Sequence, residues 1–207
     1  MFLFDTKNKD FIQSGVSENT MRMDELQILI TDEISHLIDH DLTKDYQLIG
    51  EFTKLNDHFQ NYYGLIEEVK GKIQKRGFGS YNLAGELESS LNSLKVQSLL
   101  SEYEVVIIEI SNSIYDFSLV ESNENADRIL ANIKAIIDSP TQGSSAFVNE
   151  FQGLYDSFKE FAEISKEIGA TGKQGIRAGL IKNADMILSQ SELLEETVSQ
   201  EVEKEKD

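Results

Sequence analysis

One stretch of this sequence occurs twice, and this repetition constrains the fold more than any other feature. The first copy spans residues 55–91 and the second spans residues 147–184. Their apolar positions match at a separation of 92 residues up to a glycine-containing break, and at 93 residues after it. The turn has therefore gained or lost one residue. A repeated unit of helix, turn and helix predicts two related helical hairpins joined in one chain.

In the first helix of each copy, which for the first copy begins before residue 55, the apolar residues recur at alternating steps of four and three, the spacing of a helix that buries one stripe. The first stripe contains Leu48, Phe52, Leu55, Phe59, Tyr62, Ile66, Val69 and Ile73, and the second contains Phe147, Phe151, Leu154, Phe158 and Phe161. Basic residues and then two glycines follow the first stripe, as is typical of the end of a helix. We therefore expect a helix over residues 43–76 with Thr43 as its cap.

The rest of the chain shows the same kind of pattern, and no segment alternates strictly between apolar and polar residues. We interpret residues 1–17 as an N-terminal arm, residues 18–200 as one helical domain and residues 201–207 as a charged tail. Long stripes joined by short loops predict an all-α fold of antiparallel helices packed at about 20°. The six main helices are expected at 18–40, 43–76, 83–119, 124–137, 147–169 and from about 173 onward.

The composition limits the possible partners. The formal net charge is -18 and the chain has no cysteine. Nucleic acid and anionic membrane surfaces both need a basic face, so neither is an expected partner. No run approaches the roughly 20 apolar residues of a membrane span, so we expect a soluble chain whose membrane spans, if any, flank it.

The polar residues do not indicate an enzyme. His36 and His40 lie four residues apart beside Glu33, a spacing that can hold zinc. A polar helix flank near solvent explains the same spacing, and we favour that interpretation. No nucleophile can be paired with a general base, and neither glycine-rich turn ends as a phosphate loop does. The sequence therefore predicts no catalytic residue, no metal and no cofactor.

Arginine is the natural residue for holding a carboxylate, because it stays charged and binds it with two hydrogen bonds. The chain has four arginines. Arg76 lies at a helix end and Arg128 lies next to a cap, so both are expected in solvent. Arg22 and Arg177 lie nearer the apolar stripes and are our candidate ligand-binding residues. A surface role for each remains open.

Three pieces of the chain together resemble the helical bimodular sensor domain of bacterial chemoreceptors and sensor kinases. The second copy of the repeat resembles that domain's second-half signature, the first copy resembles the same motif, and the segment between them is similar to the stretch before its next helix. The pieces are residues 63–77 with 83–87, residues 115–128, and residues 154–158 with Gly169 and residues 175–180. Their order matches from about residue 20 to residue 201.

This resemblance implies an architecture and a function. It implies two stacked four-helix modules that share long helices, an extracytoplasmic (periplasmic) position between two membrane spans, and a homodimer. It also implies binding of a small metabolite, often an organic acid, with the signal passed along the long helices. The net charge of -18 fits an amine, a neutral metabolite or a protein partner better than a dicarboxylate. The rival interpretation is a soluble helical interaction or scaffold protein without a small-molecule ligand.

Overall fold

The computed structural model describes residues 9–98, 103–119, 121–139, 145–169 and 173–204, and these residues form an all-α fold without strands. The prediction of an all-α protein is therefore confirmed for this part of the chain. The helices are α1 (Lys9–Ser14), α2 (Glu18–Asp39), α3 (Asp41–Asp45), α4 (Ile49–Arg76), α5 (Asn82–Ser98), α6 (Glu104–Leu119), α7 (Asn123–Ile137), α8 (Ser145–Ile168) and α9 (Gly175–Lys204).

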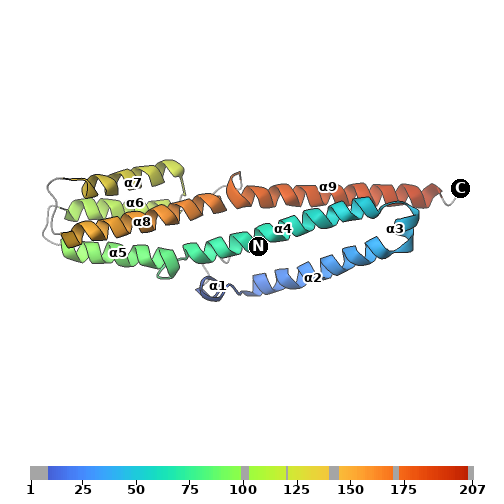
Figure 1. Ribbon diagram of the computed structural model, residues 1–207, viewed down its shortest axis with the longest axis horizontal. Helices are drawn as coiled ribbons and strands as arrows, with labels where there is room; N and C mark the ends of the chain where they lie inside the picture. Colours follow the sequence, from blue (N-terminus) through green and yellow to red (C-terminus); the bar gives the residue numbers. More distant parts are fainter. Residues whose placement is uncertain (1–8, 99–102, 120, 140–144, 170–172, 205–207) are drawn as a thin grey trace.

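The helices form an elongated molecule with different packing at its two ends (Figure 1). At one end α5, α6, α7 and α8 lie together, and at the other α2 and α9 each pack along α4. The short helix α3 connects α2 to α4 at the far end. The molecule therefore has a four-helix end and a three-helix end.

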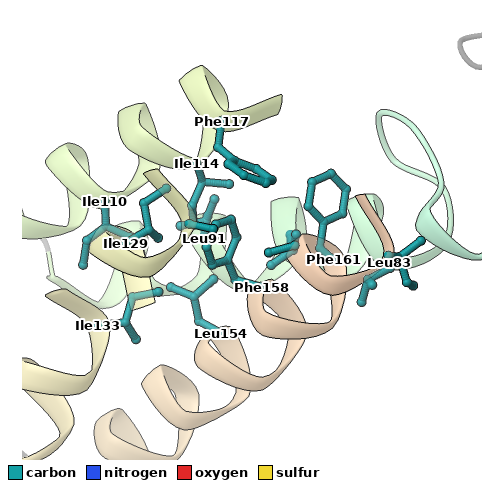
Figure 2. Close-up of a cluster of buried hydrophobic side chains, with 14 of the residues drawn as sticks. Leu83, Leu91, Ile110, Ile114, Phe117, Ile129, Ile133, Leu154, Phe158 and Phe161 are labelled. Atoms are coloured by element: carbon teal, nitrogen blue, oxygen red, sulfur yellow. The ribbon is translucent and has the colours of Figure 1, made fainter. Parts of the chain in front are cut away.

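The four-helix end holds most of the core. Side chains from all four helices meet there, and Phe117 packs edge-on against Phe158 with ring centroids 5.4 Å apart (Figure 2). Phe151, Leu154 and Phe158, which belong to the second apolar stripe, are all 0% exposed. Burial of this many large apolar side chains is the main source of stability at this end.

The three-helix end has a smaller and less complete core. Leu48, Phe52 and Leu194 are buried there, but Phe59 and Tyr62 of the same apolar stripe on α4 are only half-buried. Several apolar side chains on the outer helices are also exposed, namely Leu26, Ile28, Leu29 and Leu37 on α2 and Ile181, Leu188 and Leu193 on α9. The outer helices of this end therefore leave apolar side chains uncovered.

The two glycine-containing breaks have matching backbone geometry. Gly77 and Gly169, 92 residues apart, have φ angles of 75° and 87°, and Asn82 and Gly175, 93 residues apart, have φ angles of 54° and 63°. These left-handed conformations end one helix and begin the next. However, α5 continues onward from α4, and α9 continues onward from α8 (Figure 1). The expectation of helical hairpins was wrong, because each break is an in-line joint.

Two predicted helix boundaries were also wrong. The helix expected over residues 43–76 is divided into α3 and α4, because Gln47 adopts a left-handed φ of 58° that interrupts it. His40, rather than Thr43, caps α3: its Nδ1 accepts a hydrogen bond from the amide of Leu42. The helix expected over residues 83–119 is two antiparallel helices, α5 and α6, and the connection at residues 99–102 lies outside the described residues.

Serine side chains cap two of the described helices. Ser122 caps α7 by accepting a hydrogen bond from the amide of Asn125 at 3.1 Å. Ser17 caps α2 with a reciprocal pair of bonds to Thr20. The N-terminal segment contributes more than an arm would, because Phe11 of α1 is 0% exposed and belongs to the main core. The sequence also predicts a loop at residues 139–144, where proline and glycine fall close together, and most of that segment lies outside the described residues.

Candidate functional site

A buried arginine marks the level at which α4 ends. Arg76 is the last residue of α4 and is 9% exposed. Its Nη1 donates to the carboxylate of Glu121, which lies between α6 and α7. Its guanidinium also lies over the ring of Phe161 on α8, 6.0 Å from the ring centroid. Arg76 thus connects α4 with α8 and with the connection between α6 and α7.

The guanidinium of Arg76 is paired with Glu121 but not fully hydrogen-bonded. Burial lowers the pKa of its guanidinium, and the ion pair with Glu121 opposes this effect. The nearby charge of Arg177 lowers the pKa further. The Nε atom of Arg76 is buried and donates to no atom in the described part of the chain. Such a group gains more than an exposed arginine from additional negative charge or a hydrogen-bond acceptor.

Arg76 lies at one end of a groove with a volume of about 540 Å³ between α5 and α6. Its apolar part includes Leu87, Leu91 and Ile114, which are buried in the core of the four-helix end. Polar side chains from both helices line the rest, namely Asn92 on α5 and Ser111, Tyr115 and Ser118 on α6. A groove with an apolar floor and a few polar groups is the usual form of a small-molecule site.

Two further charged residues lie along the groove on α5, Glu88 and Lys95. Ala84, near the joint, and Lys95 are separated by 11 residues, which corresponds to about 16 Å along a helix. Glu88 lies between these two positions. The negative charge of Glu88 is therefore flanked by the positive charge of Arg76 at one end of the groove and that of Lys95 at the other.

The structure places the two predicted ligand-binding arginines in different settings. Arg177 is half-buried in the first turn of α9, close enough to Arg76 to affect its pKa. Arg22 is exposed on α2 and does not line the groove. The two side chains are therefore not gathered into one site, and a role for either in binding a ligand stays a prediction.

The expectation that Arg76 is solvated was wrong, and the sequence held a signal against it. The apolar stripe steps through Ile66, Val69 and Ile73, and the next step of three reaches Arg76. The repeat also indicates that this position is buried, because the residue 92 positions later is Ile168, which is 0% exposed. Arg128 does lie in solvent, where its Nη2 donates to Asn125.

The other candidate positions are less suited to binding a metal or a small molecule. His36 and His40 are exposed, and the described residues contain no group of three His, Cys, Asp or Glu side chains that could hold a metal. A second hollow of about 340 Å³ lies between α4 and α8, but charged side chains dominate its lining. Four of them form two ion pairs across it, Lys72 with Glu167 and Lys75 with Glu160, both at 2.6 Å.

Comparison with protein-family models, with curated proteins and with solved structures found no match for this chain. None of the helices that the structure describes has both the length and the apolar character needed to cross a membrane.

Proposed function

We propose that this chain is the ligand-binding part of a bacterial sensory receptor, such as a chemoreceptor, and that a small metabolite binds in the groove between α5 and α6. The observation that carries the proposal is the position of Arg76. It lines the groove and is also the terminal residue of α4, a helix of 28 residues and about 42 Å. A ligand bound in the groove therefore contacts the end of a long helix directly.

The proposed mechanism is a shift between two packing arrangements. A ligand that binds one arrangement more tightly raises the population of that arrangement. A change at Arg76 acts on α4, and α4 packs along α9, which ends far from the groove. We propose that these two helices pass the change toward the three-helix end.

The proposed architecture has two stacked modules, with α4–α5 and α8–α9 as the long shared helices. The four-helix end is one module. The other is the three-helix end, completed by a second copy of the chain. The exposed apolar side chains of α2 and α9 support a homodimer at this end. We place this assembly outside the cytoplasm, between flanking membrane spans of a longer receptor.

A thermal-shift screen of organic acids, amino acids and amines tests the proposed function. A ligand that binds only the folded state stabilises it by about 2.7 kcal/mol at a hundredfold excess over its dissociation constant. Ser118→Trp should abolish the shift by filling the groove. Asn112→Trp, at an exposed position on α6 outside the groove, should leave it intact. If no compound shifts the midpoint, or if both variants respond like the wild type, the groove is not the site.

A helical scaffold protein is the second candidate, and the exposed apolar side chains of the three-helix end favour it. Leu29 on α2 and Leu188 on α9 are 60% and 62% exposed. Such side chains suit docking against another helical protein. A scaffold function predicts that no small molecule shifts the unfolding midpoint. It also predicts that a purified partner protein binds the chain and that Leu188→Asp abolishes this binding.

A further inference from the structure

The charged side chains that line the groove sum to zero. Arg76 and Lys95 are positive, and Glu88 and Glu121 are negative. A ligand with a net negative charge would enter this balanced groove against the field of a protein whose net charge is -18. A simple cation would meet the buried guanidinium of Arg76 and leave its Nε without an acceptor. The arrangement therefore favours a ligand that carries both signs.

The positions of the charges allow a carboxylate and an ammonium to bind at the same time. A guanidinium has five N–H donors, and the bond from Arg76 to Glu121 uses only its Nη1 nitrogen. Glu88 lies four residues beyond Ala84 on α5, about 6 Å along the helix, and its side chain is exposed and adjustable. Its carboxylate can therefore accept from an ammonium placed over the middle of the groove.

The apolar floor of the groove favours an apolar side chain on the ligand. Leu91 on α5 and Ile114 on α6 belong to this floor, and both are less than a tenth exposed. An apolar side chain that covers them removes further apolar surface from water. The volume of about 540 Å³ leaves room for one or two residues of this kind.

We infer that the groove binds a zwitterion with an apolar side chain, an amino acid or a dipeptide, with its carboxylate at Arg76 and its ammonium at Glu88. This inference rests on the proposed function, because it names the ligand class of the same groove. Tyr115 and Ser118 supply polar contacts to the backbone groups of the ligand, and Leu91 and Ile114 receive its side chain.

Four probes with related carbon skeletons test this inference by calorimetric titration of the whole chain. L-Leucine and L-leucyl-L-leucine carry both charges and distinguish an amino acid from a dipeptide. 4-Methylpentanoate lacks the ammonium, and 3-methylbutylamine lacks the carboxylate. We expect the tighter zwitterion to bind at least tenfold more tightly than either singly charged probe.

A pair of glutamate variants assigns the ammonium contact. Glu88→Gln should reduce the affinity for the zwitterion to that for 4-methylpentanoate. Glu86→Gln, at an exposed position on α5 outside the groove, should leave the tenfold preference unchanged. Because both positions are exposed, neither variant should impair folding.

The outcomes separate this inference from the proposed function. If a singly charged probe binds as tightly as the zwitterions, or if Glu88→Gln behaves like Glu86→Gln, the inference is overturned while the groove remains a ligand site. The inference also fails if other compounds of the wider screen bind but neither zwitterion does. If nothing in the screen binds, the inference and the proposed function both fail.

Discussion

Phe59 and Phe151 occupy matching positions of the repeated stripe, 92 residues apart, yet Phe151 is 0% exposed and Phe59 is only half-buried. The difference follows from what covers each ring. Phe151 faces a core formed by four helices, whereas Phe59 lies where only α2 and α9 pack along α4. The same apolar stripe therefore supports a complete core at one end and an incomplete core at the other.

The first prediction concerns self-association at the three-helix end. Because Leu188 is 62% exposed there, we expect the chain to dimerise and Leu188→Asp to weaken the dimer at least tenfold. Sedimentation over a range of concentrations measures this change. Val96→Asp, a substitution of another exposed apolar residue but on α5, is the matched control and should leave the dimer intact. A wild-type chain that stays monomeric at all concentrations would contradict the prediction.

The second prediction concerns the ion pair between Arg76 and Glu121, whose side chains are 10% and 16% exposed. Arg76→Leu leaves the carboxylate without its cation, so the free energy of unfolding should fall by about 3 kcal/mol. Combining it with Glu121→Leu should restore much of that loss, because no unpaired charge then remains. Urea unfolding measures both effects.

An exposed ion pair provides the control for this experiment. Lys134 and Asp138 lie 3.5 Å apart with side chains that are 62% and 60% exposed. Lys134→Leu should change the free energy of unfolding by less than about 1 kcal/mol. If Arg76→Leu costs no more than Lys134→Leu, the burial of the Arg76 pair has no energetic consequence.

The third prediction is a pH dependence at alkaline pH. Tyr63 on α4 donates to Asp24 on α2 at 2.6 Å. Burial raises the pKa of the Tyr63 phenol above its ordinary value, and the hydrogen bond to Asp24 raises it further. In the unfolded chain the phenol ionises near its ordinary value of about 10.

The folded state therefore keeps the Tyr63 proton at pH values where the unfolded state loses it. This contribution to stability is complete below about pH 10 and declines as the pH rises toward the folded pKa. Tyr63→Phe should lower stability near neutral pH by about 1 kcal/mol. It should also make the alkaline decline shallower. Thermal unfolding between pH 7 and pH 11 measures the two slopes, and equal slopes would exclude the contribution of Tyr63.

The fourth prediction uses glycines in different backbone settings. Gly77 has a φ of 75°, and an added Cβ would lie 2.0 Å from the carbonyl oxygen of Tyr81. Gly77→Ala should therefore destabilise the fold by more than the roughly 1 kcal/mol that a left-handed conformation alone costs. Gly71, inside α4, has no atom within 4 Å of an added Cβ, so Gly71→Ala should stabilise by up to about 1 kcal/mol. Chemical denaturation of both variants checks that the two effects have opposite signs.

Much of the helical content could be predicted from the sequence, because periodic apolar residues report directly which face of a helix is buried. The cap at Ser122 depends on equally local chemistry, because a serine side chain accepts a hydrogen bond from the amide three residues later. The direction of the chain after Gly77 could not be predicted from the sequence, because a left-handed residue ends a helix both in a hairpin and in an in-line joint. The break between α5 and α6 was missed for a related reason, because apolar residues continue through it without glycine or proline.

The candidate site was less predictable than the fold. The groove depends on how far apart α5 and α6 lie, and this separation is set by packing across the whole four-helix end. Arg76 shows where sequence reasoning could have succeeded: its position in the stripe, matched by Ile168 in the second copy, indicated burial. Its chemical type and its place at a helix end indicated solvent instead, and packing prevailed over both.

The overlap of α4 with α8 has a mechanical consequence. Their last turns lie side by side, joined by the ion pairs Lys72–Glu167 and Lys75–Glu160. The two ends of the molecule are therefore held together in two ways. One is the continuous chain, and the other is the lateral contact between the last turns of α4 and α8, which also transmits a bending force. Added salt screens exposed charges while leaving apolar cores largely unaffected. The bending stiffness of the molecule should therefore fall with rising ionic strength while its folded content stays constant.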